Sequence, residues 1–358
     1  MRVVLSGYFG FGNLGDEAVL AAMLAALRPR MPATEFTVLS ADPQSTARQH
    51  GVRAVSRLGP HAFRAMAGAD LVISGGGSLI QDVTSIRSPL YYLGMLAAGR
   101  ALARRSMVYA QGIGPLRRRW LRTLTGWIGN RVDALTVRDD ESQRELAACG
   151  VRRAVDVVAD PVFALPAAPP ERAAELLGPP VRPRIGMVLR SWGDSGYVEP
   201  LLAAIRTIAG EAGAELLVLV FHPAKDQMIS AQAAARLDAR IVSGVTPQDM
   251  MAVIGTLDLV VGARLHALIC AAVTGVSLIG LTYDPKVAAL VRRIGAGSLL
   301  PVDALPAEEV RQVLASAWAA RGQTRTVLLT RVPELRRAAL RAADLAAALA
   351  GFPSKPTE

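Results

Sequence analysis

The sequence has 358 residues, of which 51% are hydrophobic and 20% charged, and its formal net charge is +10. This composition excludes a disordered or fibrous chain, and the length exceeds what one hydrophobic core usually fills, so we expect two globular domains. The two cysteines, Cys149 and Cys270, are too few for a disulfide framework and lack metal-ligand spacing, which indicates a reducing, cytoplasmic setting. The positive charge favours anionic partners: nucleic acid, phosphorylated substrates or an acidic membrane surface.

We expect neither a signal peptide nor a membrane span. Met1-Arg2 leads into a short apolar run that ends at Gly7, unlike a secretory signal. The charge-free stretch from Leu265 to Tyr283 has small residues near Thr274, followed by the strand-like run Val276–Leu281. This pattern predicts a helix followed by a strand rather than a span.

The first half of the chain alternates short apolar runs with amphipathic stretches. The predicted strands are Val3–Ser6, Glu35–Ser40, Asp70–Ser74, Met107–Ala110 and Ala134–Val137. The predicted helices include Glu17–Leu27, Leu90–Ala103, Leu121–Ile128 and Glu141–Ala148. Regular alternation of strand and helix indicates a parallel sheet covered on both faces. A proline-rich passage from Pro166 to Pro183 then predicts a domain boundary.

The same alternation restarts in the second half. The predicted strands are Arg184–Leu189, Glu215–Phe221, Ala239–Ser243, Asp258–Val261 and Val276–Thr282. The predicted helices include Pro200–Glu211, Gln227–Leu237, Pro247–Gly255, Ala267–Thr274 and Lys286–Ile294. We therefore expect an α/β protein with two doubly wound, Rossmann-like domains, residues 1–170 and 183–330, facing each other across a cleft. Residues 331–358 form a C-terminal helix and tail. Ligands of such sheets bind beyond the carboxyl ends of the strands.

The first loop has a glycine pattern that resembles a dinucleotide fingerprint. Gly10, Gly12 and Gly15 follow a strand and precede a helix, as that fingerprint requires. Asp16 and Glu17 argue against it, because carboxylates at a helix start compete with a bound pyrophosphate. These acids either stabilise the helix end, with Asn13 nearby, or supply a sugar-binding group or a general base.

Two further glycine loops follow predicted strands. Gly75, Gly76 and Gly77 allow either a tight turn or a close approach to a substrate or anion, and polar residues follow at Gln81, Asp82 and Arg87. The loop Gln111–Pro115 leads into a basic cluster, Arg117–Arg122, which contains Trp120. This cluster is either a solvated helix face or a contact with anionic lipid headgroups. No nucleic-acid-binding motif accompanies it.

Cationic and titratable residues end several strands. Arg138 is either a ligand contact or part of a salt-bridged helix cap. His222 is either an acid/base group or a strand-end cap. His266, two residues after Arg264, lies where a strand gives way to a helix, and histidine is suited to proton transfer near neutrality. Lys286 is one of only three lysines among 40 basic residues.

Six of these segments come in the order seen in polysaccharide pyruvyl transferases, and the chain resembles that family from Arg2 to about Ile294. It looks most like the bacterial branch that modifies the cell-wall polymer to which S-layer proteins anchor. The segments are Gly7-Tyr8…Asn13-Leu14-Gly15-Asp16-Glu17-Ala18, Ser74-Gly75-Gly76-Gly77-Ser78-Leu79-Ile80-Gln81-Asp82, Gln111-Gly112-Ile113-Gly114-Pro115, Val137-Arg138-Asp139, Gly262-Ala263-Arg264-Leu265-His266-Ala267 and Tyr283-Asp284-Pro285-Lys286.

The resemblance implies a fold like that of the GT-B glycosyltransferases, phosphoenolpyruvate as donor, no cofactor and a lipid-linked glycan with N-acetylmannosamine as acceptor. It implies His266 as general acid, with Arg138 and Lys286 binding the donor. Arg264 is either an alternative donor contact or a structural ion-pair partner. The general base is Asp16 or Glu17. Acceptor contacts are expected from the first two glycine loops, at Asn13, Gly75, Gly76, Gly77, Gln81, Asp82 and Arg87.

Two alternatives stay open. A nucleotide-sugar glycosyltransferase has the same architecture, and Asp284 is then the candidate for gripping the ribose. A non-catalytic anion- or glycan-binding protein is the other alternative. The four histidines and two cysteines show no metal-ligand spacing, so we expect no metal.

Overall fold

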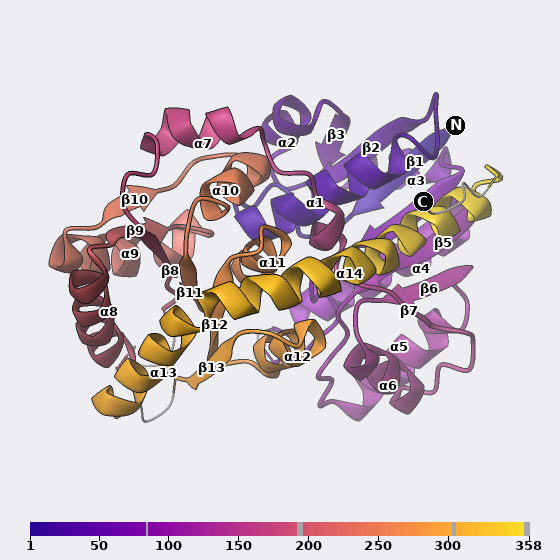
Figure 1. The fold of residues 1–358 in the computed structure, drawn as a ribbon. Helices are drawn as coiled ribbons and strands as arrows, with labels where there is room; N and C mark the ends of the chain where they lie inside the picture. The colour runs from indigo at the N-terminus through magenta and orange to yellow at the C-terminus, as the bar shows by residue number, and fades with distance from the viewer. Residues whose placement is uncertain (84, 192–195, 303–305, 354–358) are drawn as a thin grey trace. The chain divides into compact units, whose positions relative to one another are not determined.

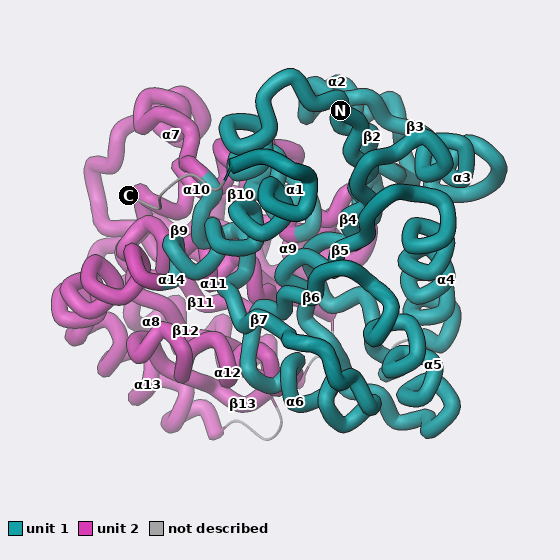
Figure 2. Tube along the Cα trace, turned by 90° about the vertical axis from the view of Figure 1, so that its right-hand side faces the viewer, with its two compact units in different colours: residues 1–11, 16–165, 335–358 teal, residues 12–15, 166–334 magenta. Residues whose placement is uncertain are grey.

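The computed structural model describes residues 1–83, 85–191, 196–302 and 306–353 (Figure 1). The chain divides into two compact units. Unit 1 comprises Met1–Phe11, Asp16–Leu165 and Leu335–Glu358, and unit 2 comprises Gly12–Gly15 and Pro166–Glu334 (Figure 2). The main boundary lies at the start of the proline-rich passage, and residues 335–353 group with the first unit.

Unit 1 is built on a parallel sheet of seven strands among the described residues, in the order β3-β2-β1-β4-β5-β6-β7. Its strands are β1 (Arg2–Ser6), β2 (Glu35–Ser40), β3 (Arg53–Ser56), β4 (Leu71–Gly75), β5 (Arg105–Gln111), β6 (Ala134–Val137) and β7 (Asp156–Val157). Its helices are α1 (Leu14–Leu27, whose first two residues belong to unit 2), α2 (Pro43–His50), α3 (Pro60–Ala67), α4 (Arg87–Leu102), α5 (Arg119–Gly129) and α6 (Asp140–Ala148).

Unit 2 repeats this plan. Its sheet has six parallel strands among the described residues, in the order β10-β9-β8-β11-β12-β13. The strands are β8 (Arg184–Val188), β9 (Glu215–Leu219), β10 (Arg240–Val242), β11 (Leu259–Gly262), β12 (Ser277–Thr282) and β13 (Ser298–Pro301). The helices are α7 (Pro170–Leu177), α8 (Val198–Ala212), α9 (Pro223–Leu237), α10 (Pro247–Ile254), α11 (Leu265–Val273), α12 (Pro285–Ile294), α13 (Ala307–Ala319) and α14 (Arg321–Leu349, whose C-terminal part belongs to unit 1).

Both sheets reverse their strand order beside the first strand of the unit, at β1/β4 and at β8/β11. This reversal defines the doubly wound, Rossmann-like fold and the point on the sheet edge where ligands bind in such folds. The central strands are buried on both faces, as β4 and β8 are along their whole length. Two Rossmann-like α/β domains are therefore confirmed.

The structure adds elements that the apolar pattern does not predict. α2 and β3 are polar or half-exposed, so they lack the apolar runs that mark a buried strand or helix. The proline-rich passage contains α7, whose first residue is Pro170, a position where proline's missing N–H costs no helical hydrogen bond.

α14 extends through Pro333, and its C-terminal part is tied to unit 1 where Arg30 Nε donates to Asp344 at 2.6 Å. The stretch from Leu265 to Tyr283 forms α11 and β12, as predicted. No helix in the described part of the chain is both long and apolar enough to cross a membrane.

Candidate functional site

The carboxyl edge of the unit 2 sheet gathers polar side chains from four strands. β9, β8, β11 and β12 are successive neighbours in the sheet. The loops that follow them carry His222, Arg190, Arg264 and Tyr283 respectively. Because parallel strands end at the same edge, chemistry that is scattered over almost 100 residues of sequence meets at one place.

Arg264 has a carboxylate partner inside unit 2. Its Nε donates to Oδ2 of Asp226 at 2.9 Å, and Asp226 is only 1% exposed. Burial raises the pKa of Asp226, and the Arg264 guanidinium partly offsets the shift. Arg264 therefore forms an ion pair with Asp226, as one of the two alternatives predicted, and its contact with a donor stays a prediction.

Arg190 is held by two tyrosines. Its Nη1 donates to the Tyr283 hydroxyl at 2.5 Å, and its guanidinium carbon lies 4.5 Å from the centre of the Tyr283 ring. The Tyr197 hydroxyl donates to the Arg190 carbonyl at 2.6 Å. These contacts fix a cation at the reversal point of the sheet, a position that suits an anionic ligand.

His266 lies in the first turn of α11, directly beyond β11. A side chain at Gly15 would place its Cβ 2.3 Å from Nδ1 of His266, so only glycine leaves room for the imidazole there. The segment with Gly15 is fixed within unit 2, because the N–H of Leu14 donates to the Phe221 carbonyl at 2.8 Å. Asn13 supports the turn by accepting from the N–H of Gly15 at 3.3 Å. Gly15, the last glycine of the first loop, therefore packs against His266, the proposed acid.

His222 is a buried histidine directly before the first residue of α9. The residue is 4% exposed, and neither ring nitrogen has a hydrogen-bond partner among the residues that the structure describes. Burial lowers the pKa of His222 to about 4, and the charges of Arg264 and Lys225 add to the effect. The imidazole is therefore neutral near pH 7, and leaving it without a partner costs on the order of 1–3 kcal/mol.

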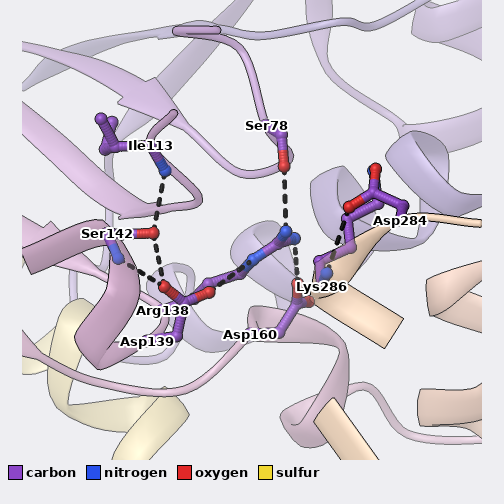
Figure 3. A network of polar contacts seen from close by, with 8 residues as sticks. All are labelled: Ser78, Ile113, Arg138, Asp139, Ser142, Asp160, Asp284 and Lys286. Carbon is purple, nitrogen blue, oxygen red and sulfur yellow. Dashed lines mark hydrogen bonds and ion pairs between the residues drawn. The ribbon is translucent and has the colours of Figure 1, made fainter. Parts of the chain in front are cut away.

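Lys286 lies in the first turn of α12, where Asp284 caps the helix by accepting from the Lys286 N–H at 3.1 Å. The Lys286 ammonium lies 2.9 Å from the other Asp284 oxygen (Figure 3). Its side chain is about one third exposed, so the ammonium can exchange this partner for a ligand at little cost.

The carboxyl edge of unit 1 is also polar, and Arg138 there lies between two carboxylates. Arg138, 6% exposed, contacts Asp160 at 3.1 Å and Asp139 at 3.5 Å and donates to the Ser78 hydroxyl at 2.9 Å (Figure 3). A Cβ at Gly112 would lie 2.7 Å from its Nη2, so that glycine makes room for the guanidinium. Both the salt-bridge interpretation and a ligand contact are compatible with this geometry, and the donor role stays a prediction.

The loop Gly75–Gly77 is packed under α1. A Cβ at Gly75 or Gly76 would lie within 2.3 Å of Met23 or Val19, and one at Gly77 would lie 3.0 Å from Oδ1 of Asp16. These glycines therefore provide close helix–loop packing, the tight-turn alternative, and they bring the Asp16 carboxylate over the loop. Burial raises the pKa of Tyr8, and the charge of Asp16 adds to that shift.

Glu17 and Asp82 hold the architecture of unit 1. The Glu17 oxygens accept from the Gly10 N–H at 2.8 Å and contact His50 Nε2 at 3.1 Å. Asp82 accepts from the N–H groups of Arg117 and Arg118 at 2.9 and 3.0 Å. Burial alone would raise the pKa of Asp82, but these bonds hold it below its usual value. Both carboxylates are engaged in internal structure.

The remaining predicted acceptor contacts lie near the surface of unit 1. Gln81 accepts from the N–H of Val83 at 2.8 Å, and Arg87, an exposed residue, begins α4. Sequence reasoning missed Asp226 and Tyr283 as partners of Arg264 and Arg190. Asp226 lies four residues after His222, a helical spacing that could have linked it to the same edge.

Within the described ranges, no group of three or more histidine, cysteine, aspartate or glutamate side chains could hold a metal ion.

The two-domain fold is shared with several solved structures. The UDP-GlcNAc 2-epimerase from Neisseria meningitidis, bound to UDP-GlcNAc, is 9% identical with a TM-score of 0.65 and covers 98% of this chain and 99% of its own. The S. aureus MnaA–UDP structure is 10% identical with a TM-score of 0.68, over 100% and 99%. Acinetobacter baumannii MurG is 15% identical with a TM-score of 0.53, over 96% and 98%. At these identities the likeness concerns the fold alone.

The sequence, unlike the fold, shows to which family the protein belongs. The model of the polysaccharide pyruvyl transferases matches residues 13–285, about three quarters of the chain, and the protein belongs to this family. No curated protein matches the chain.

Proposed function

We propose that the protein transfers a pyruvyl group from phosphoenolpyruvate to a sugar, forming a cyclic ketal and releasing phosphate. The single observation that carries this proposal is the family match over residues 13–285, which includes Asp16, Arg138 and His266. The presence of Arg190, Arg264 and Lys286 at the carboxyl edge of unit 2 supports a donor with two anionic groups. No redox cofactor is needed, because the reaction involves no net oxidation or reduction, and we propose that no other cofactor takes part.

The reaction needs an acid, a base and cations. Protonation of the donor's methylene makes the adjacent carbon electrophilic, and two sugar hydroxyls then bond to that carbon while its bond to the phosphate oxygen breaks. One hydroxyl proton balances the proton taken up by the methyl group, and the other leaves with phosphate. His266 is the proposed acid because histidine titrates near neutral pH.

Lys286 and Arg138 are the proposed contacts of the donor's anionic groups, with Arg264 as a further candidate. Lys286 can exchange Asp284 for the donor, whereas Arg138 would bind it while still paired with Asp160. Asp16 and Glu17 are both candidates for the base, and the Glu17 oxygens contact Gly10 and His50.

The proposed acceptor is a lipid-linked cell-wall glycan with N-acetylmannosamine, of the kind modified by the branch that supports S-layer anchoring. This assignment follows from the resemblance of the loop motifs, and unit 1 is the proposed acceptor side. Gly77, Gln81 and Arg87 lie beyond β4 and are the first candidates for contacts with the sugar.

The test is a phosphate-release assay with phosphoenolpyruvate and an N-acetylmannosamine-containing lipid-linked glycan, with product mass measured. Phosphate release that requires the glycan and adds a pyruvyl ketal to it supports the proposal. Transfer of a sugar from a UDP-sugar instead would establish the runner-up function, a glycosyltransferase. Binding of either ligand without any turnover would favour a non-catalytic binding protein.

A further inference from the structure

We propose that His222 belongs to the phosphate-binding site of unit 2, where its imidazole donates a hydrogen bond to the phosphate of the donor and to the released inorganic phosphate. This inference rests on the proposed function and extends it to a residue outside the motifs that carry the family resemblance.

The surroundings of His222 favour an oxyanion. His222, Arg190 and Arg264 follow three neighbouring strands at one sheet edge. The charges of Arg190, Lys225 and Arg264 all act on His222, and Asp226 contacts Arg264. The 15-residue helix α9 begins immediately after His222, and its N-terminus adds partial positive charge.

The side chain of His222 has the chemistry of a ligand contact rather than of a cap. It occupies the N-cap position of α9 without making a capping hydrogen bond. It is 96% buried, and its two ring nitrogens have no partner within the described ranges. A neutral imidazole carries one N–H donor, which a phosphate oxygen can accept. Binding phosphate would thus satisfy a buried group that the protein itself leaves unsatisfied.

The experiment titrates the full-length protein with inorganic phosphate by calorimetry, and then with phosphoenolpyruvate. His222→Phe keeps the size of the ring and removes both nitrogens, whereas His222→Gln keeps one polar group. We expect phosphate to bind about ten- to a hundredfold more weakly to His222→Phe, with partial recovery in His222→Gln. The exposed His61→Gln is the control and should bind like the unmodified protein.

Unchanged phosphate affinity in a folded His222→Phe would overturn the inference, as would failure of the unmodified protein to bind phosphate while it still consumes phosphoenolpyruvate. If His222→Phe does not fold, an unchanged affinity in His222→Gln and in His222→Leu overturns it equally. If the unmodified protein does not turn over phosphoenolpyruvate at all, that result contradicts the proposed function and not the inference about His222.

A second inference rests on a different surface, the outward face of α5. We infer that this face docks on an anionic lipid surface. Trp120 and Trp127 are 48% and 53% exposed, and a spacing of seven residues places them on the same side of the helix. The opposite side is buried through Leu121, Thr125 and Ile128.

Charge and side-chain chemistry select lipid as the partner. The exposed residues Arg117 and Arg119 precede or begin α5, Arg131 follows it with its guanidinium carbon 4.0 Å from the centre of the Trp127 ring, and α5 contains no acidic residue. Tryptophan rings favour the boundary between water and hydrocarbon, and arginines beside them bind anionic headgroups. A lipid-linked acceptor would reach an enzyme that is held at such a surface.

Vesicle sedimentation tests this inference, with phosphatidylcholine alone and with added phosphatidylglycerol. We expect binding to the anionic vesicles only, and at least tenfold weaker binding by Trp120→Ser/Trp127→Ser. The control Met228→Ser/Leu329→Ser removes two side chains of unit 2 that are 73% and 64% exposed, and it should bind normally. Equal binding by the tryptophan variant, or no preference for anionic vesicles, would overturn the inference. So would capture of RNA or protein by the same face in place of lipid.

Discussion

Units 1 and 2 share one topology but use the carboxyl edges of their sheets differently. In unit 1 the charged groups at this edge largely satisfy one another: Arg138 is paired with Asp160, and Glu17 contacts His50. In unit 2 the edge carries Arg190, Lys225, Arg264 and Lys286, of which Arg264 contacts Asp226 and Lys286 contacts Asp284. The same scaffold thus gives one edge whose Arg138 is buried in an ion pair and one with several arginine and lysine side chains.

This difference suits a division of roles. A neutral sugar is recognised mainly by hydrogen bonds, whereas phosphoenolpyruvate needs cations. The proposal that unit 2 supplies most of the donor contacts and unit 1 most of the acceptor contacts accords with that contrast, and each of the changes below would break it or sharpen it.

The largest expected effect is on turnover, from His266→Ala. Removing a positioned acid typically lowers the rate by about a hundred- to ten-thousandfold. We expect this loss with an unchanged melting temperature, because His266 is only partly buried in the first turn of α11. Phosphate-release rates and thermal unfolding measure the two quantities. Near-normal turnover in the folded variant would remove His266 from the mechanism.

Arg138→Met should lower stability as well as donor binding. It leaves Asp160 buried without its cation, which typically costs about 3–5 kcal/mol of unfolding free energy. Arg53→Met is the matched control, because its pair with Glu35 is exposed and worth about 1 kcal/mol or less. Urea unfolding compares the two variants. Normal stability of Arg138→Met would show that its pair with Asp160 does not hold the fold, and unchanged donor binding would remove Arg138 from the proposed donor site.

The buried His222 predicts a pH-dependent stability. Its pKa is lowered from 6.5 to about 4 by burial and by the charges of Arg264, Lys225 and Arg190, so the unfolded chain binds the proton more tightly. Unfolding free energy should therefore fall as the pH decreases from about 6.5 towards 4, by at most about 3 kcal/mol. His222→Phe should flatten this part of the pH profile of urea unfolding. An identical profile in the variant would mean that His222 does not titrate as described.

Gly15→Ala should lower turnover by about ten- to a hundredfold, since displacing a catalytic group by about 1 Å has effects of this order. The new methyl group would lie 2.3 Å from Nδ1 of His266. Gly210→Ala on α8 is the control, because its methyl group meets no atom within 4 Å among the described residues. That variant should keep full turnover and gain slight stability. Full turnover in Gly15→Ala would show that His266 tolerates displacement.

The sequence predicted the Rossmann-like alternation because the central strands are buried on both faces and therefore appear as apolar runs. It also placed the candidate residues on the loops beyond those strands. It missed α2 and β3, whose exposed or polar residues carry no such pattern. Local patterns also cannot show contacts between distant segments. The ion pair of Arg264 with Asp226 spans 38 residues, and Leu14 bonds to Phe221 across more than 200.

The most direct test of the central claim is calorimetric titration of the purified protein with phosphoenolpyruvate and, in parallel, with a UDP-sugar. We predict saturable binding of phosphoenolpyruvate alone. We also predict that Lys286→Ala in unit 2 weakens this binding, while Arg87→Ala in unit 1 leaves it unchanged. Binding of the UDP-sugar in place of phosphoenolpyruvate would contradict the account and assign the anion-binding site of unit 2 to a nucleotide.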